Sequence, residues 1–293
     1  MKAKPVKKIT LALRPGTEPD FHNIVNNLIR WLVKRDKVLI FDKSEEQRVK
    51  SFASKKSIEH CLFLDDMFED SDLIISLGGD GTLLGVLRKA PEKLATFGVN
   101  LGHLGFITEF SKTDFYESLN QVFLGELKTK AIPAYKVTHK RGNKLSSYHF
   151  INDFVISKRN LARMFTVSVD VDDEHLYDLR GDGLIVSSTV GSTAYSMAAG
   201  GPIVSDNVEA FILTPICPQG LNYRPLVLSD KSLIRVQLRE DGENISITLD
   251  GQHEVEIEKR DSLVIGPGKR DVILIENEQY RFFQALKEKF NHA

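Results

Sequence analysis

The pentapeptide Gly78-Gly79-Asp80-Gly81-Thr82 directly follows the apolar run Leu73–Leu77. Its glycines allow a backbone turn with positive φ and let a phosphate approach the amides closely. A helix that begins at Thr82 would direct its first N–H groups at the same place, where they favour an anion. A carboxylate repels phosphates, so Asp80 needs another purpose: accepting the proton of an attacking hydroxyl, or helping to hold Mg²⁺. The alternative is a strand-ending turn in which Asp80 is a polar cap.

A second group of glycines and hydroxyls occurs later in the chain. Gly181-Asp182-Gly183 precedes Gly191-Ser192-Thr193-Ala194-Tyr195, and Gly200-Gly201-Pro202 follows. Such a loop can wrap a nucleotide, because hydroxyls and amides bind ribose or base edges and Tyr195 can stack on a ring. A glycine-rich turn between core strands explains the same residues equally well.

A third polar feature, the pair Asn152-Asp153, interrupts the apolar run Phe150–Ser157. An adjacent amide and carboxylate suit the vicinal hydroxyls of a ribose. A turn or an edge position is the simpler explanation. Bound phosphates also need cations, for which Arg180 and, more weakly, Arg163 are candidates. Arg180 could equally be a solvated surface residue, and for Arg163 that is the simpler explanation.

The composition limits the classes of function. The chain has 293 residues, 42% of them hydrophobic and 27% charged, with a net charge of −1. That length suits one large domain or two ordinary ones, and the charge balance gives no general field for nucleic acid or acidic lipid. Cys61 and Cys217 are far apart, and no cysteine–histidine cluster indicates zinc. No apolar run is long enough for a signal peptide or a membrane span, so we expect a cytoplasmic protein.

The elements that must position these residues change in character near Gly125. Before it, strand and helix alternate, which predicts an open, Rossmann-like α/β domain. After it, short strands alternate apolar with polar residues, which predicts a β-rich domain with two sheets. The predicted elements of the first part are strands Lys8–Leu13, Val38–Phe41, Leu73–Leu77 and Leu94–Val99 and helices Asp20–Lys34, Thr82–Lys89 and Thr113–Phe123.

At the end of the chain, Tyr280–Phe290 returns to helical spacing and can pack on the first domain. We therefore expect an α/β domain of residues 1–128, joined by the tail 276–293, and a β-rich domain of residues 129–275. The active site is expected in the cleft between them.

Taken together, these segments resemble the bacterial NAD kinases. Gly78–Thr82 is similar to that family's Gly-Gly-Asp-Gly-Thr motif, and Asn100–Phe106 to its Asn-x-Gly-x-Leu-Gly-Phe segment. Further segments follow in the family's order: the pair Asn152-Asp153, the glycine-rich motif Gly181–Tyr195 with Gly200–Ile203, the stretch Leu213–Cys217 with Arg224–Leu228, and Leu249–Gln252. The first motif alone also fits diacylglycerol and sphingosine kinases, and Gly191–Tyr195 separates the families.

The resemblance implies that ATP and NAD give ADP and NADP by phosphorylation of the adenosine ribose 2′-hydroxyl. Asp80 would be the general base or would orient that hydroxyl. Mg²⁺ would arrive with ATP and would not be held by the protein alone, Asp80 being the one side chain that could assist. The family also implies a homodimer or homotetramer with NAD and ATP, and not nucleic acid or membrane, as partners.

The implied roles of the binding residues differ along the chain. Phosphates would lie against the glycine loop, adenine near Phe106 and the Thr193–Tyr195 segment, and ribose hydroxyls at the Asn–Asp pair. Asp182 would contact the other nucleoside end, and an arginine at position 180 goes with ATP as donor in this family. The complete set is Gly79, Gly81, Thr82, Asn100, Phe106, Asn152, Asp153, Arg163, Arg180, Asp182, Thr193, Ala194, Tyr195, Ser196, Asp250 and Gln252.

One segment departs from the family pattern. Ser188-Thr189-Val190-Gly191 stands where the family has Thr-Pro-Thr-Gly, and Ala198 stands where many members have serine. This departure motivates one of two alternatives to the NAD kinase interpretation, a non-catalytic NAD(P)-binding regulator. The other alternative is a lipid kinase with the same first motif.

Overall fold

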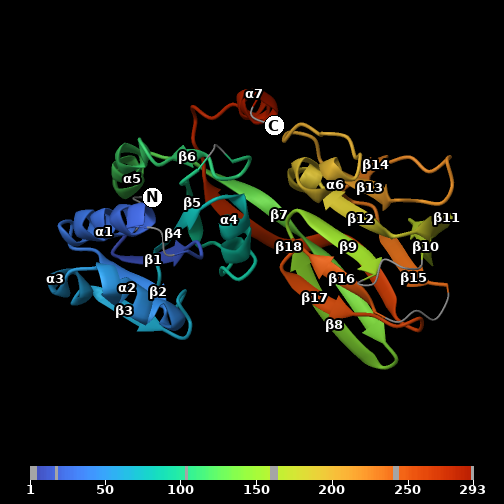
Figure 1. The fold of residues 1–293 in the computed structure, drawn as a ribbon, viewed down its shortest axis with the longest axis horizontal. Coiled ribbons are helices and arrows are strands. Elements are labelled where there is room, and N and C mark those ends of the chain that lie inside the picture. Colours follow the sequence, from blue (N-terminus) through green and yellow to red (C-terminus); the bar gives the residue numbers. More distant parts are fainter. Residues whose placement is uncertain (1–4, 17–18, 103–104, 159–163, 240–243, 292–293) are drawn as a thin grey trace. The chain divides into compact units, whose positions relative to one another are not determined.

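The computed structural model describes residues 5–16, 19–102, 105–158, 164–239 and 244–291 (Figure 1). Arg163, one of the two predicted phosphate-binding arginines, lies outside the described residues, as does part of the Asn100–Phe106 segment. The chain forms two compact units, one of residues 1–132 with 272–293 and one of residues 133–271. Among the described residues, no helix is long and apolar enough to cross a membrane.

The first unit contains a parallel sheet in the order β18-β5-β4-β1-β2-β3 (Figure 1). The chain passes from β1 to β2 and β3 on one side, then to β4 and β5 on the other side of β1. Ligands of such sheets bind at the carboxyl ends of the strands where the order reverses, here β1 and β4. The strands are β1 (Lys8–Leu13), β2 (Val38–Asp42), β3 (Cys61–Leu64), β4 (Leu73–Gly78), β5 (Ala95–Asn100) and β6 (Phe110–Ser111).

Helices cover both faces of this sheet. Phe21, Val25 and Leu28 of α1 are buried with Ile75 on one face, whereas Val86 of α4 is buried with Ile74 on the other. This arrangement follows from the alternation of side chains along a strand, since Ile74 and Ile75 point to opposite faces. The helices are α1 (Pro19–Val33), α2 (Glu46–Phe52), α3 (Lys55–Ile58), α4 (Asp80–Leu87), α5 (Phe115–Leu124) and α7 (Phe282–Asn291), with a 3₁₀ turn η1 (Lys43–Glu45).

The second unit contains two antiparallel sheets. One has the order β14-β13-β12-β9-β16-β17, and in the other β11, β10, β15 and β18 are successive neighbours, with β7 pairing β18 and β8. The strands are β7 (Thr129–Arg141), β8 (Lys144–Phe150), β9 (Asp153–Lys158), β10 (Phe165–Val171), β11 (Glu174–Gly181), β12 (Gly183–Ser188), β13 (Ala210–Ile216), β14 (Leu226–Ser229), β15 (Ile234–Leu238), β16 (Ile245–Leu249), β17 (His253–Glu256) and β18 (Ser262–Ile275). A 3₁₀ turn η2 (Val190–Thr193) and a short helix α6 (Tyr195–Ala198) complete the unit.

One core joins the two sheets of the second unit. Phe154, Val186 and Phe211 from the first sheet share a buried cluster with Val169 and Val236 from the second. Alternate residues of a strand face this core, as Leu184 and Val186 of β12 do, while Ile185 between them is buried on the opposite face of the sheet. The α/β and two-sheet architecture expected from the sequence is confirmed.

The structure contains elements that the sequence did not predict, among them β3, α2, α3 and the hairpin of β7 and β8. Helix α4 begins at Asp80 rather than at the predicted Thr82, and β18 runs without a break through Gly266-Pro267-Gly268. A Cβ on Gly268 would lie 1.9 Å from the Ala134 carbonyl oxygen, so this glycine is required by the close approach of β7. The chain passes from one compact unit to the other inside β7 and β18 rather than in loops.

Candidate active site

Asp80 occupies the first helical position of α4, immediately after the buried strand β4. Gly79 is the N-cap residue with an extended backbone, at φ −121° and ψ −169°. A Cβ on Gly78 would lie 2.3 Å from Thr82 Oγ1, so the turn requires glycine there. The negative charge of Asp80 is favoured at this end of the helix, where the first N–H groups have no acceptor inside the helix.

The Asp80 carboxylate is held by the backbone that follows β5. Its Oδ2 accepts a hydrogen bond from Phe106 N at 2.8 Å. Its Oδ1 accepts from Thr108 N at 3.0 Å, from Thr108 Oγ1 at 2.7 Å and, more weakly, from Ile107 N at 3.3 Å. The donors fill the acceptor sites of Oδ1 and leave Oδ2 with capacity for one more donor. The carboxylate therefore has a fixed orientation and one oxygen free to accept a proton donor.

Gly105 allows this arrangement, because a Cβ at that position would lie 2.0 Å from Asp80 Oδ1 and 2.0 Å from Thr108 Oγ1. Asn100, at the end of β5, supports the same loop. Its amide donates to Thr108 Oγ1 at 2.8 Å and its carbonyl oxygen accepts from Gly102 N at 2.8 Å. Asn100 thus orients the Thr108 hydroxyl, which in turn donates to Asp80 Oδ1. The sequence did not indicate this role.

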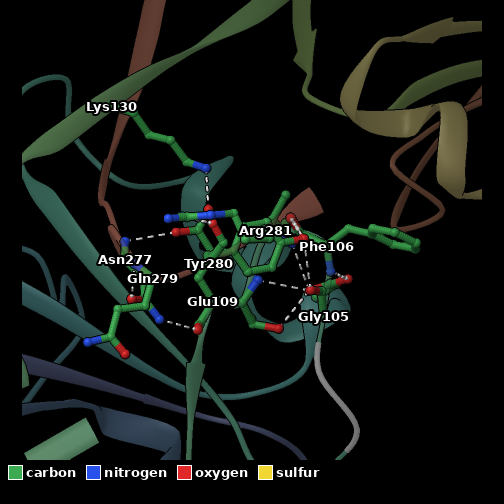
Figure 2. A network of polar contacts seen from close by, with 11 residues as sticks. Gly105, Phe106, Glu109, Lys130, Asn277, Gln279, Tyr280 and Arg281 are labelled. Carbon is green, nitrogen blue, oxygen red and sulfur yellow. Dashed lines mark hydrogen bonds and ion pairs between the residues drawn. The ribbon is translucent and has the colours of Figure 1, made fainter. Parts of the chain in front are cut away.

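The C-terminal segment fixes the far side of the loop, as Figure 2 shows. Tyr280 Oη donates to the carbonyl oxygens of Gly105 and Phe106 at 3.4 and 3.3 Å. Asn277 donates from N and Nδ2 to the side chain and the backbone of Glu109, each at 2.9 Å. Lys130 forms an ion pair with the buried Glu109 carboxylate. The loop that orients Asp80 is therefore held by residues from both chain segments of the unit, 1–132 and 272–293.

A pocket of about 310 Å³ opens beside Asp80. Arg14, which follows β1, and Lys289, on α7, supply the positive charges of its lining. The strand order accounts for Arg14, because β1 and β4 end at the point where that order reverses. The complete lining is Arg14, Gly78, Gly79, Asp80, Asn100, Leu101, Gly102, Gly105 and Lys289.

Neither of these cations was predicted from the sequence. Lys289 Nζ lies 3.7 Å from Asp80 Oδ2 and 4.1 Å from the centroid of the Phe106 ring. No local pattern marks Lys289, since it is one lysine of an amphipathic tail. For Arg14, the signal was its place directly after the first strand of an alternating α/β pattern.

Among the residues described, no group of three or more histidine, cysteine, aspartate or glutamate side chains could hold a metal ion. Asp80 is the carboxylate of the pocket lining. Mg²⁺ is commonly bound by one or two carboxylates together with substrate phosphates and water. The single carboxylate of Asp80, with one free oxygen, fits this mode of binding.

The second unit has a pocket of its own, of about 360 Å³. Five predicted site residues line it together: Asn152, Asp153, Ala194, Tyr195 and Asp250. Val155, Ser157, Thr248 and Gly251 complete the lining. The Tyr195 side chain is 47% exposed, as a ring available for stacking should be.

Asp250 organises this pocket from a turn with φ +51°. Its carboxylate accepts hydrogen bonds from three successive amides: Ile151 N at 3.1 Å, Asn152 N at 2.7 Å and Asp153 N at 3.2 Å. The Asp250 N–H in turn donates to the Asp153 carbonyl oxygen at 2.9 Å. Asp250 thus shapes the backbone that presents the Asn–Asp pair to the pocket.

The Asn–Asp side chains carry unused hydrogen-bonding capacity. Asn152 Oδ1 is buried with no partner among the described residues. Asp153 is 5% exposed, and burial, with a smaller effect of the Asp250 charge, raises its pKa to about 7. Buried polar groups are normally paired, so these two side chains are suited to bind a polar ligand in the pocket.

The segment Ser188-Thr189-Val190, which departs from the family pattern, forms hydrogen bonds from its hydroxyls to nearby backbone groups. Ser188 Oγ donates to Ile151 O at 2.6 Å and accepts from Gly191 N at 3.1 Å. Thr189 Oγ1 donates to Val208 O. A Cβ on Gly191 would lie 2.1 Å from Asn152 O, so this loop is packed against the Asn–Asp pair. The substituted residues therefore support the pocket instead of lining it.

The remaining predicted site residues lie elsewhere. Gly81 is exposed and Thr82 is half-buried in the first turn of α4. Ser196 is buried and its hydroxyl pairs with Thr214 Oγ1 at 2.8 Å, while Thr193 Oγ1 donates to Val190 O at 3.3 Å. Arg180, Asp182 and Gln252 are outside the lining of both pockets.

Comparison with known proteins identifies the family. The ATP-NAD kinase N-terminal domain matches residues 9–127, and the ATP-NAD kinase C-terminal domain matches residues 151–277. An NAD kinase from Geotalea daltonii is 33% identical over 287 residues, which covers 97% of this chain and 98% of that protein. An NAD kinase from Thermoanaerobacter sp. strain X514 is 35% identical over 289 residues, which covers 97% of this chain and 99% of that protein.

Solved structures show the same fold. Yeast NADH kinase complexed with NADH has a TM-score of 0.88 at 23% identity, covering 98% of this chain and 88% of that one. An NAD kinase from Archaeoglobus fulgidus in complex with ATP has a TM-score of 0.73 at 24% identity, covering 96% and 98%. The comparisons do not favour the lipid kinase or the regulator. With two matching domains and full-length relatives above 30% identity, the chain belongs to the ATP-NAD kinase family.

Proposed function

We propose that the chain transfers the γ-phosphoryl group of ATP to the 2′-hydroxyl of the adenosine ribose of NAD, with Asp80 as the group that accepts or orients the hydroxyl proton. One observation carries the residue assignment. Asp80 is held by four donors from the loop after β5, yet its Oδ2 keeps acceptor capacity at a pocket. A fixed carboxylate at the pocket can align a hydroxyl without first reorganising.

The donor phosphates are assigned to the Asp80 pocket. The N-terminus of α4 favours an anion there, and Arg14 and Lys289 bring positive charge. Mg²⁺ would enter with ATP and neutralise developing charge on the phosphates, with Asp80 Oδ2 as the protein oxygen able to contact it. The roles predicted for Gly81 and Thr82 at the phosphates belong to this proposal.

The nucleoside part of NAD is assigned to the pocket of the second unit. Asn152 Oδ1 and the Asp153 carboxyl would bind ribose hydroxyls, and Tyr195 would stack on a base. The roles of Phe106, Arg180, Asp182, Thr193, Ser196 and Gln252, the cytoplasmic location and the homodimer or homotetramer stay predictions.

The variant Asp80→Asn tests the assignment. The purified protein is supplied with NAD, ATP and Mg²⁺, and NADP is measured by a coupled dehydrogenase. We expect kcat to fall on the order of a thousandfold, the range for loss of a general base, while NAD still binds. Asp206→Asn, an exposed aspartate in the second unit, is the control. An unchanged kcat in Asp80→Asn would remove Asp80 from the chemistry.

A further inference from the structure

We propose that Lys289, on the C-terminal helix α7, binds the donor triphosphate, and that its ion pair with Asp80 keeps it at the pocket before the donor arrives. The inference rests on the proposed function, because it assumes that phosphates enter the Asp80 pocket. It assigns the tail of the chain a direct part in substrate binding.

The position of Lys289 follows from the way the tail is anchored. Asn277 and Tyr280 bind the loop that follows β5, and the Phe282 ring lies 6.0 Å from the Phe106 ring. Ala285 is fully buried. Residues 282, 285 and 289 recur at the spacing of one helix face, so the face that packs on the unit also directs Lys289 towards the pocket.

The ammonium group of Lys289 keeps capacity for new partners. Its Nζ is 3.7 Å from Asp80 Oδ2, which is close enough for an ion pair but beyond the reach of a hydrogen bond. It also lies over the Phe106 ring, 4.1 Å from the centroid. An ammonium offers three donors, and the flexible lysine stem lets them move to phosphate oxygens. The side chain is 37% exposed and lines the pocket, so such oxygens can reach it.

Binding of a triphosphate changes the balance of charges around Lys289. With the pocket empty, Lys289 offsets the single charge of Asp80. A triphosphate brings several negative charges next to that carboxylate, and the ammonium group gains more by contacting the phosphates than by staying on Asp80 alone. The transfer also moves the ammonium group away from Asp80 Oδ2, the oxygen assigned to the acceptor hydroxyl. Donor binding would thus remove the Lys289 charge from the oxygen that the reaction needs.

Three variants test the proposal: Lys289→Gln, Lys289→Arg and the control Lys287→Gln, an exposed lysine on the same helix. Formation of NADP by the unchanged protein is established first. Binding of ATP with Mg²⁺ is then measured by calorimetry without NAD, and KM is determined for each substrate. The two readouts separate failure of the inference from failure of the proposed function, because calorimetry needs no turnover.

We expect Lys289→Gln to weaken ATP binding and raise KM for ATP on the order of tenfold to a hundredfold, the value of a charge-assisted hydrogen bond. KM for NAD and the melting temperature should stay unchanged, arginine should restore most of the affinity, and Lys287→Gln should behave as wild type. Unchanged ATP affinity in Lys289→Gln would overturn the proposal. So would tighter binding, which would mean that Lys289 blocks the pocket, or an equal loss for both substrates with a lower melting temperature.

Discussion

Replacing Asp153 with asparagine should stabilise the protein at neutral and alkaline pH while weakening its affinity for NAD. The Asp153 side chain is almost completely buried, at 5% exposure, and it faces the pocket of the second unit. Burial and the Asp250 charge raise its pKa, and no donor among the described residues offsets them. The negative charge of Asp153 therefore lowers the free energy of unfolding, and a role in ligand binding explains why such a residue is present.

The magnitude follows from the shift in pKa, from 3.8 to about 7. Because the pKa in the folded state is raised, the folded protein binds more protons than the unfolded chain between these values, and stability falls as pH rises through this window. At about 1.36 kcal/mol per pKa unit, the cost is about 2 kcal/mol at pH 5 and about 4 kcal/mol at pH 8. It vanishes below the pKa of the unfolded chain.

Urea unfolding of the wild type and of Asp153→Asn at pH 5 and pH 8 measures this cost, with Asp206→Asn as the control. The variant should be more stable than the wild type at pH 8, by a margin that shrinks at pH 5, and its KM for NAD should rise. A variant that is less stable at both values, or a margin that does not depend on pH, would refute the reasoning. The first result would mean that the Asp153 carboxylate has a partner in the folded protein, and the second that folding does not raise its pKa.

Two further predictions concern other parts of the molecule. Gly105→Ala should lower both kcat and the melting temperature, because its Cβ would lie 2.0 Å from Asp80 Oδ1, at a cost of about 1–3 kcal/mol for overpacking. The control Gly102→Ala should keep the melting temperature, because its Cβ meets an ordinary contact at 3.7 Å. An equal loss of melting temperature in both variants would contradict this prediction. Burial raises the pKa of the Cys61 thiol to about 12, whereas Cys217 is exposed. A thiol reagent at pH 8 should therefore label Cys217 in the folded protein and reach Cys61 only after denaturation. Rapid labelling of both cysteines in native buffer would be inconsistent with a buried Cys61.

The sequence predicted the first unit well because local signals and tertiary packing agree there. The apolar run of β4 passes directly into a glycine turn and a helix, and the strand–helix alternation around it has few alternative folds. The hairpin β7–β8 was missed. Its strands are rich in lysine, serine and threonine, so they lack both the continuous apolar run that marks β9 and the regular alternation that marks β16.

The candidate site was predictable only in part, because some of its residues depend on contacts between distant segments. Asp80, Asn152 and Asp153 stand out as polar residues next to apolar runs, and they line pockets. Lys289 and Tyr280 reach the Asp80 loop from the end of the chain, where their spacing indicates only an amphipathic helix. Asn100 and Asp250 act by ordering backbone, which the sequence pattern does not reveal.

The account depends on Asp80 Oδ2 meeting the ribose hydroxyl that receives the phosphoryl group. A crystal structure with NAD and a non-hydrolysable ATP analogue measures this distance directly. We predict Oδ2 within about 2.6–3.2 Å of the 2′-oxygen, the range for a base and the proton that it takes, while Oδ1 keeps its bonds to Thr108. A bound NAD whose 2′-oxygen lies away from Asp80, with another side chain in hydrogen-bond contact with it, would contradict the account.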